Sequence, residues 1–308
     1  MGKASKRRST RSSDPASTKS APAPFVARPF AGLPRETEWV AMRELVPAAT
    51  AQVSFAPGAV PQASTSDTSD TSDTGAISTA TIATVLPLAW PALHRADGQV
   101  LVATQSGASS GDASRDIAAA LLLAVAADEG TPVVTVPSPT LDTPRLQELL
   151  DLETPFEVSV LDGFEFWVGE AELDDDGRES LKQANDSSIP TSRVDGVTSA
   201  YWCEINGRTY VRWVLPHDED DATDALARLL AADTSRLVDG SRLLGAFRAS
   251  GLLVPVWEVP VELDPGSFSD AVVAMEGRLG EALAADAPLT PEQRRARAGL
   301  LNRQVTLR

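Results

Sequence analysis

Apolar and polar residues alternate most clearly around a single turn signal near the middle of the chain. Residues 200–216 read AYWCEINGRTYVRWVLP, with an apolar run on each side of Asn206-Gly207. Because Asn and Gly tolerate the positive φ values of a two-residue type I′ turn, this stretch predicts a β-hairpin. The turn also fixes the register of the two strands and sets Cys203 opposite Tyr210.

The two faces of this hairpin differ in chemistry. One face, with Trp202, Val211 and Trp213, predicts a core surface because all three side chains are large and apolar. The other face is amphipathic, and we expect it to be either covered by another part of the chain or used for binding. Its members are Tyr201, Cys203, Arg208, Tyr210 and Arg212.

Similar turn signals recur at a nearly constant spacing. Ser250-Gly251 lies 44 residues after Asn206-Gly207, and Asp162-Gly163 lies 44 residues before Asn206-Gly207. A fourth signal, Asp97-Gly98, lies 65 residues farther upstream, and a helical pattern starts about 14 residues after each turn glycine. A period in this range is typical of structural repeats. We therefore predict an α+β fold of repeated ββα units, with a period of about 44 residues and helices packed against antiparallel sheet.

Matched tryptophans support the repeat. Trp213 and Trp257 each lie six residues after the glycine of their turn, which predicts equivalent core anchors. We expect residues 155–286 to form three ββα units, with hairpin tips at Gly163, Gly207 and Gly251.

Apolar residues at spacings of three and four predict the helices. One stripe runs from Ala222 to Leu230 and another from Phe268 to Leu283, whereas residues 112–128 are apolar nearly all round and predict a buried helix. The remaining expected elements are helices at 34–45 and 144–151 and strands at 51–55 and 77–86.

Polar stretches divide the chain. Residues 1–28 predict a disordered basic tail, and residues 29–289 predict an α+β body with a disordered Ser/Asp/Thr loop at 64–75. Residues 290–308 predict a basic segment that docks on the body, beginning with a capped helix that we expect to stop at Gly299.

Charge is distributed unevenly. The formal net charge is −16, but residues 1–30 carry +6 and residues 291–308 carry +4, so the segment between them carries −26. An acidic body repels phosphate backbones, which argues against nucleic acid as the main partner. RNA or ribosome contact is then confined to the basic tails, and the candidate binding residues there are Arg294, Arg295, Arg297 and Arg303.

Few residues are suited to catalysis or metal binding. The chain has two histidines and one cysteine, so no Cys/His zinc spacing exists and neither a metal nor a cofactor is expected. One alternative pairs Cys203 with His217 or His94 as a thiolate nucleophile. The single cysteine, the lack of an apolar run of about 18 residues and the lack of a signal-peptide pattern predict a cytoplasmic protein.

Several longer motifs resemble a known family. They are PFAGLPRETEWVAMRELVPAATA, TVLPLAWPAL, SGDASRD, GFEFWV, AYWCE, RWVLPH, LLGAFRASGL and DAPLTPEQRRARAGLLNRQVTL. From about Pro29 to the C-terminus the chain resembles an uncharacterised actinobacterial family of unknown function. Some relatives carry an N-terminal zinc-binding SEC-C motif, like the one that closes the SecA translocase ATPase. The N-terminus of this chain has no Cys or His, so the resemblance implies neither zinc nor a translocase role here.

The sequence predicts a non-enzymatic cytoplasmic binding or adaptor protein with a protein partner, because no catalytic constellation is evident. The alternative is an enzyme or small-ligand binder. Its pocket would be lined by aromatic residues, Arg208 and Arg212, with Cys203 beside a histidine.

Overall fold

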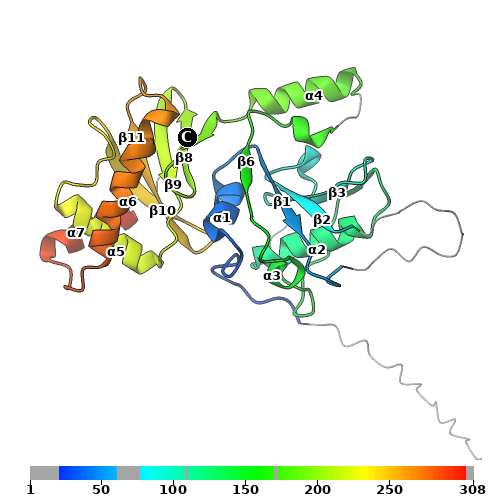
Figure 1. The fold of residues 1–308 in the computed structure, drawn as a ribbon, viewed down its shortest axis with the longest axis horizontal. Coiled ribbons are helices and arrows are strands. Elements are labelled where there is room, and N and C mark those ends of the chain that lie inside the picture. The colour runs from blue at the N-terminus through cyan, green and yellow to red at the C-terminus, as the bar shows by residue number, and fades with distance from the viewer. Residues whose placement is uncertain (1–20, 61–76, 108–109, 170–172, 303–308) are drawn as a thin grey trace, which may run out of the picture.

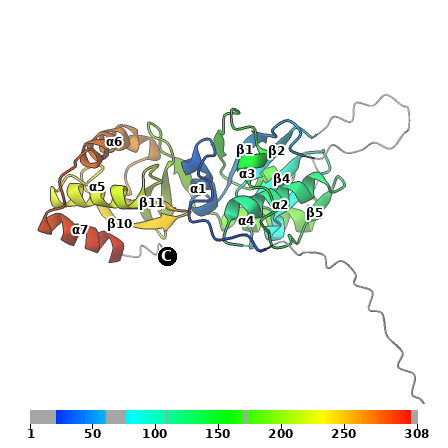
Figure 2. The ribbon, with the colours of Figure 1, turned by 90° about the horizontal axis from the view of Figure 1, so that it is seen from below.

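The computed structural model describes residues 21–60, 77–107, 110–169 and 173–302, which form two lobes on either side of one helix, α1 (Figures 1 and 2). Most of the expected basic tail, the Ser/Asp/Thr loop at 64–75, and Arg303 lie outside these residues. Residues 21–28, which fall in the predicted tail, make backbone hydrogen bonds to the body, such as Val26 N–H to the Gly111 carbonyl at 2.9 Å.

The N-terminal lobe contains a six-stranded sheet of order β5-β3-β4-β2-β1-β6. The pair β2–β4 is parallel and the other neighbours are antiparallel, so this sheet is mixed rather than purely antiparallel as predicted. Its strands are β1 (Ala49–Ser54), β2 (Thr79–Ala83), β3 (Ala92–His94), β4 (Val100–Ala103), β5 (Thr131–Val133) and β6 (Val158–Val160). Its helices and 3-10 turns are α1 (Glu36–Glu44), α2 (Ala113–Val125), α3 (Leu146–Leu149), η1 (Pro87–Ala89) and η2 (Glu165–Trp167).

The C-terminal lobe contains a five-stranded antiparallel sheet of order β10-β11-β9-β8-β7. Its strands are β7 (Thr191–Arg193), β8 (Ala200–Ile205), β9 (Arg208–Trp213), β10 (Arg242–Ala249) and β11 (Leu252–Val259). Its helices are α5 (Glu219–Ala231), η3 (Pro265–Phe268), α6 (Ser269–Leu283) and α7 (Pro291–Asn302). Helix α4 (Asp175–Asp186) joins the lobes, and Figure 1 shows it outside both sheets. None of the helices in the described ranges has the length and apolar content needed to cross a bilayer.

The structure confirms the hairpin at Asn206-Gly207. Both residues have positive φ, 54° and 72°, and the register pairs Cys203 with Tyr210 as expected. Trp213 is 2% exposed and packs with α5 and α6 in the core of the C-terminal lobe. Of the face predicted to be core, Val211 and Trp213 are buried, whereas Trp202 is half-buried and packs against them.

The amphipathic face of the hairpin is largely covered by another part of the chain, rather than open for binding. Tyr201 is fully buried and belongs to the same apolar cluster as Trp39 of α1. Glu38, also buried, accepts hydrogen bonds from the Tyr201 hydroxyl and from both terminal nitrogens of Arg193, at 2.6 and 3.1 Å. The two lobes thus share one core that contains a fully hydrogen-bonded carboxylate.

Two further turn signals are also confirmed. Ser250-Gly251 joins β10 to β11, with φ values of 46° and 81°, and Asp97-Gly98 lies in the turn between β3 and β4. A side chain at position 251 would lie 2.5 Å from the Ala27 carbonyl oxygen, so this tip needs glycine for space as well as for its positive φ.

The hairpin predicted at Asp162-Gly163 is wrong. The strand before it, β6, pairs with the free edge of β1, and the residues after it form the turn η2 instead of a second strand. Gly163 is required here for close packing, because an added Cβ would lie 2.6 Å from the Glu165 carboxylate and 2.7 Å from the Asn185 side-chain oxygen. The ββα repeat over 155–286 is therefore not confirmed, and the coarser α+β class is what the structure shows.

Helix boundaries differ from expectation at two places. The segment at 144–151 is helical only over α3 and begins after Arg145 rather than at Pro144. Helix α7 begins with the expected capping box between Thr290 and Gln293 but continues through Gly299 to Asn302. Burial of Leu300, 3% exposed in the core of the C-terminal lobe, outweighs the helix-stopping tendency of glycine.

Replacing Trp213 or Trp257 with alanine should lower the free energy of unfolding by about 3–5 kcal/mol, as for other buried large aromatics. Both indoles are nearly inaccessible, and their N–H groups donate to the carbonyls of Thr198 and Ser235 at 3.0 and 2.7 Å. Urea unfolding would measure the loss, with Val273→Ala, at a residue 46% exposed, as the control. Unchanged unfolding of both tryptophan variants would contradict their role as core anchors.

Candidate functional site

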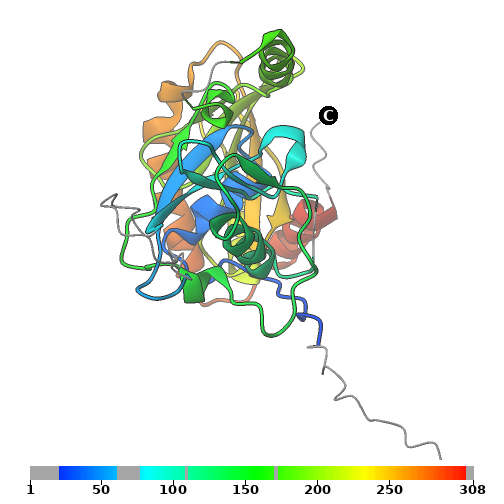
Figure 3. The same ribbon diagram turned by 90° about the vertical axis from the view of Figure 1, so that its right-hand side faces the viewer.

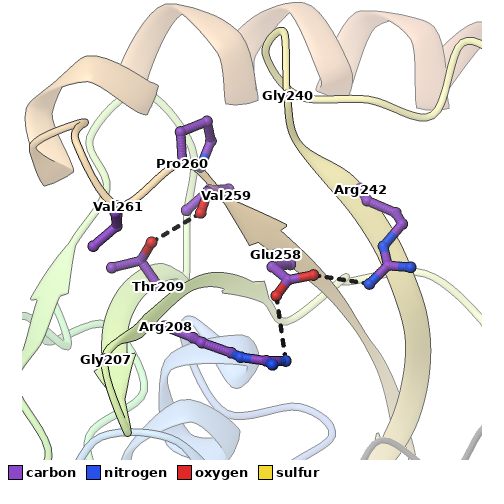
Figure 4. A pocket seen from close by; sticks show the side chains of 9 residues that line it. All are labelled: Gly207, Arg208, Thr209, Gly240, Arg242, Glu258, Val259, Pro260 and Val261. Atoms are coloured by element: carbon purple, nitrogen blue, oxygen red, sulfur yellow. Dashed lines mark hydrogen bonds and ion pairs between the residues drawn. The ribbon is translucent and has the colours of Figure 1, made fainter.

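Arg208 lines a polar hollow at the tip of the β8–β9 hairpin. The hollow has a volume of about 550 Å³ and lies between the hairpin and the ends of β10 and β11 (Figure 4). Arg208 and Arg242 converge on the carboxylate of Glu258, at 3.6 and 2.9 Å. The described lining of this hollow contains neither a thiol nor an imidazole, and its one carboxylate, Glu258, is paired with both arginines.

Arg212 and Cys203 lie inside the protein and do not share a pocket with Arg208. Arg212 donates a hydrogen bond to the Leu45 carbonyl, at 3.0 Å, at the C-terminus of α1. Burial lowers the pKa of Arg212, an effect that neighbouring Cys203 opposes. Burial likewise raises the pKa of the Cys203 thiol, and Arg212 only partly offsets this. The thiol is therefore held protonated and inaccessible, the opposite of a reactive cysteine.

The two histidines belong to other segments of the chain than Cys203. His94 in β3 is hydrogen-bonded through Nδ1 to the Ala127 carbonyl at 2.7 Å, and His217 follows β9. Within the described ranges no hydrogen bond joins either imidazole to Cys203. These ranges also contain no group of three or more His, Cys, Asp or Glu side chains arranged to hold a metal ion.

The arginines of α7 differ in their contacts: one pairs with α5, and the others that the structure describes contact only residues near the start of α7. Arg297 bridges α7 to α5 through Asp224 at 2.5 Å and Asp220 at 2.6 Å. The hydrogen bond to Asp224, reinforced by both negative charges, raises the pKa of Arg297. Arg294 donates to the Leu289 carbonyl within its own helix start, and Arg295 lies 4.0 Å from Glu292.

An apolar groove beside α4 is the most distinctive surface feature outside these predicted sites. Its volume is about 760 Å³, and its walls come from η1, β3, η2 and α4. We call it the α4 groove, and its lining residues are Pro87, Leu88, Leu93, Arg95, Ala96, Gly130, Trp167, Val168, Leu173, Gly177, Ser180, Leu181, Gln183, Ala184 and Ser187.

The floor of the α4 groove is rigidly held. Trp167 stacks on Phe164, with ring centroids 4.6 Å apart, and its indole N–H donates to the Val85 carbonyl at 2.9 Å. Phe164 in turn donates its backbone N–H to the side chain of Asn185, which fixes the C-terminal part of α4 over the turn. The groove is thus formed in the protein as it stands, rather than by rearrangement.

The α4 wall is amphipathic and has no buried residue. Gly177, Leu181 and Ala184 follow one another at spacings of four and three, so they share one side of the helix and all line the groove. Leu173, which precedes the capping residue Asp174, lines the groove beside them. In Figure 3 this helix is the green one at the upper edge of the molecule. An apolar helix face without a buried residue is unusual in a folded domain, because burial of that face normally stabilises the helix.

The opposite rim carries a strained and exposed leucine. Leu88 is 86% exposed, and it and Ala89 have φ values of 52° and 56°. The left-handed region costs a residue with a Cβ about 1–2 kcal/mol. Strain of this kind in an exposed apolar residue is a feature of functional surfaces.

Sequence reasoning missed the groove for a definite reason. The predicted hairpin includes the GFEFWV motif, whereas in the structure Trp167 of this motif forms part of the groove floor. The spacing of Gly177, Leu181 and Ala184 is the available signal for a helix side that lines the groove.

Comparison with known families places the chain. A model described as a family of unknown function, DUF5926, matches residues 29–308. The protein belongs to this DUF5926 family. Comparisons with the curated proteins and with the solved structures give no match.

The Cys203 thiol should not react with a thiol reagent such as DTNB while the protein is folded. It is fully buried, and burial raises its pKa. Because the chain has one cysteine, absorbance should report about one thiol per chain in denaturant and almost none in buffer. Rapid and complete modification of the folded protein would show that the thiol is accessible.

Truncation after Leu289 should lower the melting temperature and increase proteolysis of the body. It removes the buried Leu300 and the Arg297 ion pairs, and the leucine accounts for most of the loss because exposed ion pairs contribute at most about 1 kcal/mol. An unchanged melting curve together with lost RNA or ribosome co-sedimentation would instead assign the segment to nucleic-acid contact.

Proposed function

We propose that this protein is a non-enzymatic binding or adaptor protein and that the α4 groove holds its protein partner. The observation that carries the proposal is an open apolar groove of about 760 Å³ beside α4, a helix that has no buried residue. Contiguous apolar surface that stays open to solvent marks interaction sites.

The chemistry of the lining favours recognition over catalysis. Among the lining residues that the structure describes, Arg95 is the charged one, and its Nη2 atom is held by the Asp97 carboxylate at 2.6 Å. These described residues include no carboxylate, imidazole or thiol, which are the usual general acids, bases and nucleophiles. Leu88 at the rim and Trp167 on the floor are instead suited to contact apolar side chains.

The alternative, an enzyme or small-ligand binder that uses Arg208, Arg212 and Cys203, has less support. It needs one pocket that all three reach, whereas Arg208 lines a separate hollow and the other two are buried. We further propose that the basic tails can contact RNA or the ribosome.

We also propose that the protein is cytoplasmic and that its family is actinobacterial and includes relatives that carry SEC-C motifs.

Site-specific photo-crosslinking in native cell extract tests the proposal. A photo-reactive phenylalanine derivative in place of Leu88 should give a discrete crosslinked protein, because Leu88 stands at the groove rim. The same derivative in place of Leu141, which is 52% exposed and does not line the groove, is the matched control and should not give that product.

A second substitution makes the result specific to the groove. Leu181→Asp places a carboxylate in the apolar wall and should abolish the crosslink from position 88, while circular dichroism shows that the fold is kept. Identical products from positions 88 and 141, or a product that survives Leu181→Asp, would contradict the proposal.

A further inference from the structure

We infer that the partner presents a basic amphipathic α-helix to the α4 groove. This inference rests on the proposed function and deepens it, since it identifies the chemistry that the groove recognises. Two independent features carry it: the hydrogen bonding of the strand in the groove floor and the net charge of the segments that form the groove.

A helix is favoured because the groove offers no free strand edge. The floor strand β3 is paired on both sides, with β4 and β5. An extended peptide would therefore find no backbone partner there, whereas a helix satisfies its own backbone hydrogen bonds and needs only apolar contact from the groove. Trp167, Leu93 and Leu181 supply such contact from the floor and the α4 wall.

The length of the groove wall sets the size of the bound helix. Helix α4 has 12 residues, which at 1.5 Å per residue gives a wall of about 18 Å, or about three turns. A partner helix of about three turns, with apolar residues at positions i, i+4 and i+7 or i+8, would place one side chain on each turn of this wall.

The charge around the groove is strongly negative. The segments 87–97, 128–130, 165–168 and 173–187 supply the lining, and they contain nine acidic and three basic side chains, a net charge of −6. All three cations are already paired with a carboxylate of the same region. These pairs are Arg95 with Asp97, Arg178 with Asp175, and Lys182 with Asp186.

Other carboxylates belong to the segments on both sides of the groove, outside its described lining residues. Glu179 belongs to α4, and Glu129 precedes Gly130 on the opposite wall, near the turn at Gly98. Both glutamates are exposed. A helix bound between them would gain complementary contacts from lysine or arginine on its flanks, and acidic helices or phosphate-bearing partners would be repelled.

The basic helix of this chain does not fill the role. Helix α7 is basic and amphipathic, but Leu300 is buried in the core of the C-terminal lobe and Arg297 is paired with α5. Its apolar face is therefore occupied in the same molecule, which points to a separate protein as the source of the bound helix.

Fluorescence anisotropy with labelled synthetic helices tests the inference on the full-length protein. The first peptide has about 14 residues, with leucines on one side and lysines elsewhere. Two matched peptides keep this design but replace the lysines with glutamates or the leucines with serines. Only the lysine–leucine peptide should bind tightly, and Leu181→Asp should weaken its affinity at least about tenfold because an apolar anchor is lost.

Two double variants that reverse acidic charges distinguish recognition at the α4 groove from general attraction of a basic peptide to an acidic protein. Glu129→Lys with Glu179→Lys should weaken the lysine–leucine peptide several-fold and improve binding of the glutamate peptide. Asp239→Lys with Glu276→Lys makes the same change in net charge at exposed positions of the C-terminal lobe and should leave both affinities nearly unchanged.

Equal weakening by both double variants, or equal binding of the lysine and glutamate peptides, would overturn the inference. Either result would leave the proposed function standing if the crosslink at position 88 still depends on Leu181, since the groove would then hold a partner of different charge. Loss of that crosslink specificity would instead remove the proposed function.

Discussion

The buried carboxylate of Glu38 is the contact on which the arrangement of this protein depends. It lies on α1 between the two lobes and accepts hydrogen bonds from Arg193 and Tyr201 of the C-terminal sheet. Burial alone would lower the pKa of Arg193, but the hydrogen bonds and the charge of Glu38 raise it. Burial and the same negative charge raise the pKa of Tyr201 well above its ordinary value. Arg193 and Tyr201 are therefore both held in their protonated forms beside the Glu38 carboxylate.

A buried ion pair of this kind is strong evidence for a fixed geometry and weak evidence for extra stability. Desolvation of the Glu38 carboxylate offsets much of the attraction, whereas removal of its cationic partner would leave this buried charge unpaired, which typically costs about 3–5 kcal/mol. Most of the favourable free energy at the interface must come from apolar packing around it. Trp39 of α1 belongs to one buried apolar cluster with Val214, Leu252 and Val254 of the C-terminal lobe.

The same network determines where the α4 groove lies. Arg193 also donates to the Val158 carbonyl at 3.2 Å, which ties β6 to the interface between the lobes. The chain passes from β6 directly into η2 and then into α4, so the floor and one wall of the groove start from this fixed strand. The protein therefore encloses charged side chains between its lobes, whereas beside α4 it leaves apolar side chains open to solvent.

The sequence by itself determined the features that depend on neighbouring residues. The hairpin at Asn206-Gly207, its register and the burial of Trp213 all follow from a local turn preference and a period of two, and the structure agrees with each. Asp162-Gly163 carries the same local signal, but only the tertiary structure decided its outcome. Strand β6 pairs with the edge of β1, and the residues that follow form η2, in which aromatic side chains pack against a buried apolar cluster. The groove was beyond sequence reasoning because its walls come from segments up to about 100 residues apart, brought together by long-range packing.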